Sequence, residues 1–61
     1  MVPVTVDIEI IGGWAYRWHL RSASSRRLIA SAPWAALALT EAVARTNARL
    51  IAEARGNPVA E

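Results

Sequence analysis

Two stretches of strictly alternating apolar and polar residues, separated by a Gly-Gly pair, constrain this chain more than any other feature. The first is VTVDIEI (residues 4–10) and the second is WAYRWHL (residues 14–20), in which Trp, Tyr and Leu recur at every second position. A period of two is typical of a half-buried β-strand. Because Gly12-Gly13 between them indicates a tight turn, this part of the chain is expected to form an antiparallel hairpin.

The length of the turn determines which side chains face each other across this hairpin. A two-residue loop at Gly12-Gly13 would set apolar residues opposite charged ones, because a one-residue change of register moves a whole side-chain set across the sheet. A three-residue loop, residues 11–13, keeps both faces uniform, with Gly13 in the left-handed conformation. This loop predicts the pairs Ile10 with Trp14, Ile8 with Tyr16, Val6 with Trp18, Val4 with Leu20, Asp7 with Arg17 and Thr5 with His19.

The second half of the chain reads as one more strand and a helix. Small polar residues at 22–25 indicate a turn, and residues 26–31 (RRLIAS) read as a short strand. Its facing stays open, because either Leu28 and Ala30 or Ile29 and Ser31 could point to the core. Residues 33–55 are rich in Ala, Leu, Glu and Arg, which favours a helix.

Gly56 and Pro58 mark the end of this helix. The predicted fold class is therefore α+β, a three-stranded antiparallel meander packed on one face by a C-terminal helix. We expect a single domain over residues 1–55, followed by a C-terminal tail over residues 56–61.

The predicted helix carries two apolar strips, to which we assign different roles. The strip expected to pack on the sheet consists of Ala36, Leu39, Val43, Leu50 and Ala54. The charged residues Glu41, Arg45 and Arg49 lie on the opposite side. The second strip is either a loosely covered flank or a contact with the helix of a second copy. This candidate dimer contact consists of Leu37, Ala44, Ala48 and Ile51.

The size of the chain favours association. With 61 residues and no cysteine, the chain has no disulfide to support a small core. A single core of this size rarely supplies more than ~3–5 kcal/mol. The first strand would in addition form a long sheet edge rich in Val and Ile, which proteins seldom leave bare. A homodimer is therefore expected.

The aromatic and basic residues of the second stretch allow two interpretations each. Trp14, Tyr16 and Trp18 could stack on bases, but they share their face with Val and Ile, so a core wall is favoured. The other face presents Arg17, His19 and Arg21. These three form either an anion- or partner-binding face or a solvated face balanced by acidic neighbours.

Catalytic and metal chemistry find little support in the sequence. Thr5, Asp7 and His19 could meet on the open sheet face, but such a face is shallow and forms no pocket. His19 is the single histidine, and without cysteine a metal site would depend on carboxylates. We therefore expect a protein that is not an enzyme and that has no cofactor and no metal.

The start of the chain carries Asp7 and Glu9 and no basic segment, so no signal peptide is expected. No apolar run approaches the ~20 residues of a membrane span. We therefore expect a cytoplasmic protein without a membrane partner. All seven basic residues are Arg, and Ala is abundant, which indicates a GC-rich bacterial or phage genome.

The order of these features resembles the YegP-like UPF0339 family, also called the DUF1508 domain. The stretches that carry the resemblance are VDIEI (6–10), WAYRWHL (14–20), LIASAPW (28–34) and the Ala-rich helix from Ala35. The resemblance implies a single β-β-β-α unit that assembles into dimers. It implies no catalytic residues.

The leading hypothesis is thus a small, non-enzymatic homodimeric interaction module. One alternative is a phage-encoded inhibitor that binds a host or defence protein. Another is a weak nucleic-acid binder that uses the Arg17, His19 and Arg21 face; nucleic acid is possible as a partner but not favoured.

Overall fold

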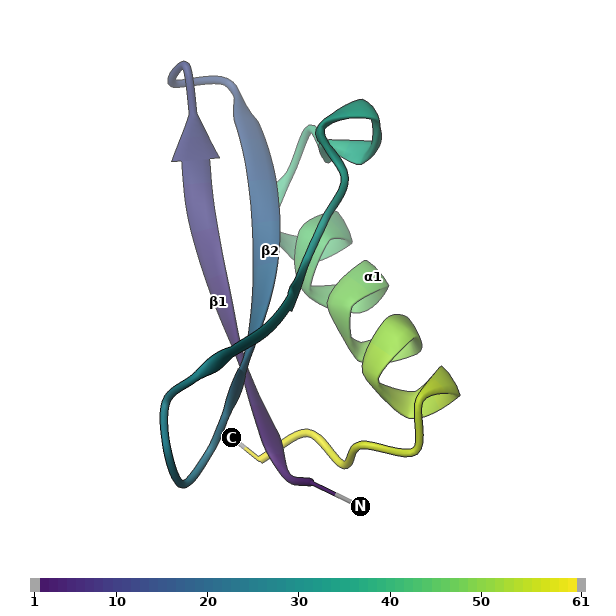
Figure 1. Cartoon of the computed structure of the whole chain (residues 1–61). Helices are drawn as coiled ribbons and strands as arrows, with labels where there is room; N and C mark the ends of the chain where they lie inside the picture. Colours follow the sequence, from purple (N-terminus) through teal and green to yellow (C-terminus); the bar gives the residue numbers. More distant parts are fainter. Residues whose placement is uncertain (1, 61) are drawn as a thin grey trace.

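The computed structural model describes residues 2–60 and contains three strands and one α-helix (Figure 1). Strands β1 (Val4–Ile11), β2 (Ala15–Ser22) and β3 (Leu28–Ser31) form an antiparallel sheet in the order β1-β2-β3. A short 3-10 helix, η1 (Trp34–Ala36), and the helix α1 (Glu41–Ala54) follow. Helix α1 contacts β1 and β2. The predicted α+β class, a meander followed by one C-terminal helix, is confirmed.

The turn of the hairpin has the predicted length but lies one residue further along the chain. It comprises Gly12, Gly13 and Trp14, so Ile11 extends β1 and pairs with Ala15. Both glycines have positive φ, 62° and 78°. Two central residues at positive φ suit the twist of a hairpin, and glycine adopts them without steric cost. The Gly-Gly pair therefore forms the centre of the turn.

This position of the turn changes the strand register by two residues. Trp18 lies opposite Ile8, so the prediction that it faces Val6 was wrong. A shift by two keeps every side chain on its face, which is why both faces remain uniform. The other predicted pairs shift with it: Val6 faces Leu20, Ile10 faces Tyr16, Asp7 faces His19, Glu9 faces Arg17 and Thr5 faces Arg21.

The core lies between the sheet and α1. Its large side chains come from the sheet, chiefly Trp18 and the fully buried Val4 and Leu20. The helix contributes only small residues, Ala48 and Ala52. Bulky sheet residues facing alanines allow the helix to approach the sheet closely and fill the space between them.

The side of α1 that packs on the sheet is not the predicted one. Ala44, Ala48 and Ala52 have no exposed surface, whereas Leu39, Val43 and Leu50 are 71%, 50% and 59% exposed. The prediction that the Leu39, Val43 and Leu50 strip packs on the sheet was therefore wrong. Trp18 and Leu20 occupy the space that large helix residues would need.

Helix α1 is also shorter than predicted, because it begins at Glu41 and not at Pro33. The Oγ1 atom of Thr40 accepts a hydrogen bond of 3.2 Å from the Val43 N–H and caps the helix. Before this cap the chain runs extended beside β2, where Tyr16 and Ala38 exchange two backbone hydrogen bonds. This pairing holds the segment between η1 and α1 in place.

The third strand follows neither predicted facing along its whole length, since only Ala30 packs against the core. Ala30 lies opposite Leu20 and packs against the core. A register shift between Leu20 and Arg21 then pairs Arg21 with Leu28. Ile29 falls between these pairs, so the strand does not alternate as a regular strand would.

The expected tail packs on the edge of β1. The Val4 N–H donates to the Pro58 carbonyl at 2.9 Å, and the Ala60 N–H donates to the Val4 carbonyl at 2.8 Å. Val59 also packs against the core. Across residues 2–60, no helix has the length and apolar character needed to span a membrane.

Candidate functional site

The predicted face of Arg17, His19 and Arg21 exists, but its three residues already have partners within the chain. Arg21 Nε donates to Asp7 Oδ2 at 2.9 Å. Arg17 Nε donates to the Ala32 carbonyl at 2.8 Å, and its guanidinium stacks 4.3 Å from the centre of the Trp34 ring. These contacts hold both arginines against the sheet and reduce their freedom to bind an external anion.

His19, the third residue of this face, lies in a hydrogen-bonded row across all three strands. Its Nε2 is 3.0 Å from Glu9 Oε1 and its Nδ1 is 2.6 Å from Ser31 Oγ. If a neutral His19 donates its Nε2 proton to the carboxylate, Nδ1 is left to accept the hydroxyl proton of Ser31. The row therefore ties β1 and β3 to β2.

A hydroxyl, an imidazole and a carboxylate in this order also occur in hydrolases. Hydrolysis further requires a pocket and donors aimed at the developing oxyanion. Neither of the two cavities described below includes Ser31, His19 or Glu9. We therefore interpret the row as a structural tie. The Ser31 contact was not predicted, because it depends on the pairing of β2 with β3.

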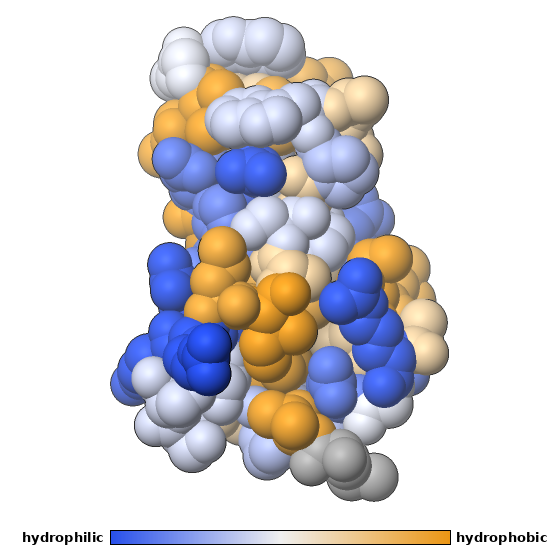
Figure 2. All heavy atoms as spheres, in the orientation of Figure 1, coloured by the Kyte–Doolittle hydropathy of each residue, from blue (hydrophilic) through white to orange (hydrophobic). Residues whose placement is uncertain are grey.

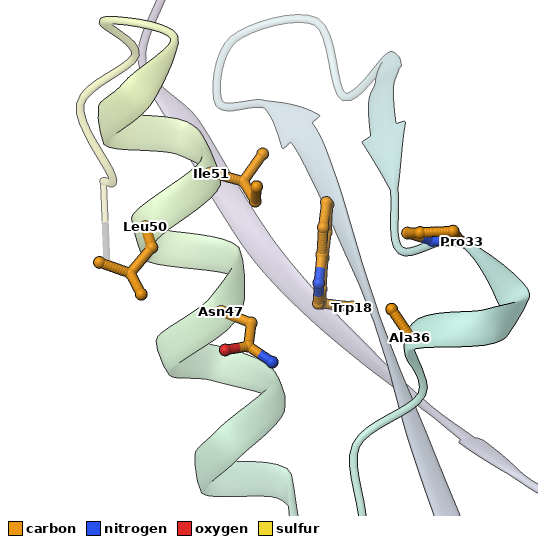
Figure 3. Close-up of a pocket in the computed structure, with 6 residues that line it drawn as sticks. All are labelled: Trp18, Pro33, Ala36, Asn47, Leu50 and Ile51. Atoms are coloured by element: carbon orange, nitrogen blue, oxygen red, sulfur yellow. The ribbon is translucent and has the colours of Figure 1, made fainter.

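A groove opens between α1 and the η1 segment (Figure 3). Trp18, which is almost fully buried, forms its floor, with the η1 side and α1 as its two walls. The groove has a volume of about 290 Å³, and Asn47 is the one polar side chain among its lining residues. The complete lining is Trp18, Pro33, Ala36, Asn47, Leu50 and Ile51.

One side of α1 beside this groove is apolar and exposed. We call it the α1 strip, and it consists of Val43, Asn47, Leu50 and Ala54. The spacing of four, three and four residues is that of the inward positions of a coiled coil. Val43 and Leu50 are half or more exposed, while Asn47 and Leu50 also line the groove. The strip therefore resembles a helix surface without its partner.

The candidate dimer contact predicted from the sequence is not an exposed surface in the structure. Ala44 and Ala48 are fully buried under the sheet, and Leu37 is half-buried. Of the four residues, Ile51 is exposed and lines the groove. Ala44 and Ala48 have no exposed surface with which to contact a second copy. The spacing along the helix could not have indicated the exposed side, because residues 44, 48 and 51 follow the same spacing of four and three as residues 43, 47 and 50.

A further apolar area lies around β3. Figure 2 shows hydrophobic residues gathered in the lower half of one face, with hydrophilic residues on both sides. Among the described residues, Val2, Leu28 and Ile29 are exposed large hydrophobic residues of this region. They line a shallow cavity of about 420 Å³ together with Ser22, Ser25, Arg27 and Asn57.

The outer edge of β1 is the last candidate surface. Val4 directs its N–H and C=O away from β2, to Pro58 and Ala60. Alternate residues of a strand point their backbone groups the same way. The groups of Val6, Ile8 and Ile10 therefore also point outward, and no hydrogen bond to them occurs within residues 2–60.

Residues 2–60 contain no group of three or more His, Cys, Asp or Glu side chains that could hold a metal ion. No family model, curated protein or solved structure matches this chain. The resemblance to the UPF0339 family therefore remains a prediction.

Proposed function

We propose that this protein is a non-enzymatic homodimeric interaction module whose two copies pack through the α1 strip. The exposure of Val43 and Leu50 carries this proposal. These residues lie one heptad apart on the same side of α1, and each exposes half or more of its surface. Large apolar side chains exposed at the spacing of a coiled-coil seam are typical of a helix that packs on another helix.

A second copy fits this surface because the strip is self-complementary. A two-fold axis places the same residues of both copies in contact. With the axis at Asn47, the two amides face each other and can exchange hydrogen bonds, so neither is buried without a partner. Val43 and Leu50 then lie on either side of the amide pair, and the neighbouring groove can receive a large side chain of the other copy.

The expected dimer is weak. Each Leu50 or Val43 side chain would lose its exposed half, which corresponds to about 1–2 kcal/mol per side chain. Association opposes this gain with the loss of translational and rotational freedom. A single pair of 14-residue helices is a small interface, so we expect the dimer to dissociate on dilution and the melting temperature to rise with protein concentration.

The experiment compares two glutamate substitutions on α1. Leu50→Glu places a charge on the strip and should make the melting temperature independent of concentration. Ala42→Glu adds the same charge on another side of the helix, where Ala42 is exposed, and should leave the concentration dependence unchanged. If the unmodified protein melts at one temperature at all concentrations, the homodimer proposal is refuted.

A monomer would favour the inhibitor alternative, in which the same strip docks on another protein. Nucleic-acid binding receives less support, because Arg17, His19 and Arg21 are held by contacts within the chain. If DNA or RNA changed the NMR chemical shifts of the backbone amides of Arg17, His19 and Arg21, and added salt abolished the change, nucleic-acid binding would be favoured instead.

A further inference from the structure

We infer that the outer edge of β1 binds an extended segment of another protein in which apolar and basic residues alternate. This inference does not depend on the homodimer, because the edge and the α1 strip lie on different elements. The mode of binding is strand addition, in which backbone hydrogen bonds supply affinity and alternate side chains supply specificity.

The backbone of β1 presents a continuous row of unused hydrogen-bonding groups. Within residues 2–60, the outward N–H and C=O groups of Val6, Ile8 and Ile10 bond to nothing. Directly before them, Val4 bonds to the extended segment Pro58–Ala60. Within the described residues, the chain's own C-terminal segment therefore already adds to this edge beside Val4.

The side chains beside this row define what an added strand would meet. Val6 and Ile8 are half-buried, and Ile10 is 61% exposed, on the face that packs toward α1. Asp7 and Glu9 lie on the other face, with about half of each side chain exposed. An added strand thus meets apolar side chains on one face and carboxylates on the other.

These carboxylates disfavour a second copy of β1 as the partner. In a two-fold antiparallel pair that uses at least two free residues of each strand, these residues match as Val6 with Ile8, as Val6 with Ile10 around a central Ile8 pair, or as Ile8 with Ile10. The first register sets Asp7 against Asp7, the second Asp7 against Glu9 and the third Glu9 against Glu9. Like charges directly opposite each other destabilise a strand pair.

A strand with basic residues removes this repulsion. On its inner side β1 already pairs with such a strand, because β2 sets Arg17 opposite Glu9 and His19 opposite Asp7, with apolar residues between them. The contacts to Arg21 and His19 use Asp7 Oδ2 and Glu9 Oε1, and no hydrogen bond or ion pair of the described residues uses the other carboxylate oxygens. Each carboxylate can therefore accept from a second cation.

Antiparallel addition brings these charges closest. The partner residues opposite Asp7 and Glu9 would occupy non-hydrogen-bonded pairs, in which the Cα atoms are ~4.5 Å apart. The partner residues opposite Val6, Ile8 and Ile10 would be apolar and would make the hydrogen bonds. The expected segment reads apolar–basic–apolar–basic–apolar.

The test titrates isotope-labelled protein with three capped peptides and follows its backbone amides by NMR. The first peptide is Thr-Val-Arg-Val-Arg-Val-Thr, the second has Glu in place of both Arg, and the third is the first with N-methyl groups on its three Val residues. We expect the amides of residues 6–10 to shift with the first peptide. Its affinity should exceed that of the second by at least tenfold, and the third should not bind.

Two protein variants test separately what the backbone hydrogen bonds and the carboxylates of β1 contribute to peptide binding. Ile10→Pro removes an outward N–H that makes no internal bond, and it should weaken binding at least tenfold relative to the control Ile10→Ala. Asp7→Asn with Glu9→Gln should remove the preference for the basic peptide. Equal binding of the basic and acidic peptides, shifts confined to α1, or no binding of the basic peptide would overturn the inference. So would shifts of residues 6–10 on dilution of the protein alone, which would identify a second copy as the occupant.

Discussion

Substitution of two leucines of this chain by alanine should lower the stability of the fold by very different amounts. Leu20 is fully buried in β2, and Leu50 is 59% exposed on α1. Leu20→Ala leaves a cavity among Val4, Trp18 and Ala52, and such changes cost about 2–5 kcal/mol. Since a core of this size supplies only ~3–5 kcal/mol, the Leu20→Ala variant should be largely unfolded at room temperature.

Leu50→Ala should leave the fold of the single chain nearly unchanged. About two-fifths of the Leu50 surface is covered, so its loss costs about 1 kcal/mol or less, and the higher helix propensity of Ala offsets part of that loss. Circular dichroism during urea and thermal unfolding, at the lowest practical protein concentration, measures both variants. If Leu50→Ala destabilised the chain more than Leu20→Ala, α1 would face the sheet with its leucines, and the described orientation of the helix would be wrong.

Three further substitutions test separate parts of the fold by the same unfolding measurements. Trp18→Ala should cost ~3–5 kcal/mol and unfold the chain; a folded variant with a dispersed NMR spectrum would show that Trp18 is not a core residue. Thr40→Ala should cost ~1 kcal/mol through the lost helix cap, and an unchanged melting temperature would contradict that role. Gly13→Ala should cost roughly 1–2 kcal/mol from its φ of 78° alone, because an added Cβ meets no neighbour; Gly13→Asn should cost less, and equal costs would argue against a backbone origin.

The hairpin was predictable because its alternation is complete. In residues 4–10 and 14–20 each side chain was assigned to its sheet face by a period of two. The same pattern does not distinguish registers that differ by two residues, because both leave the faces uniform. That choice depends on the turn, where Gly12 and Gly13 together take the two positions at positive φ.

The orientation of α1 could not be obtained from hydrophobicity alone. Both sides of the helix are apolar, and we expected the side with the larger residues, such as Leu50, to be buried. The opposite is observed because Trp18 and Leu20 already fill the space above the sheet, which leaves room only for small residues such as Ala48 and Ala52. Complementary volumes of two elements, and not the hydrophobicity of one, determine which side packs.

The start of α1 had a local signal that the composition of the segment concealed. Thr40 followed by Glu41 is a typical helix start, but the Ala- and Leu-rich residues before it also favour a helix. Tertiary pairing decides against that extension, since Ala38 bonds to the backbone of Tyr16. The two proposed interaction surfaces depend on this packing, because they are the sides of α1 and β1 that the rest of the described chain leaves uncovered.

Sedimentation equilibrium of the unmodified protein, over a wide range of concentration, tests the central claim most directly. The homodimer predicts an average mass that rises from that of one chain toward twice that mass, with Leu50→Glu remaining at the mass of one chain and Ala42→Glu following the unmodified protein. A mass of one chain at every concentration would contradict the homodimer. A rise that Leu50→Glu leaves intact would contradict the assignment of the interface to the α1 strip.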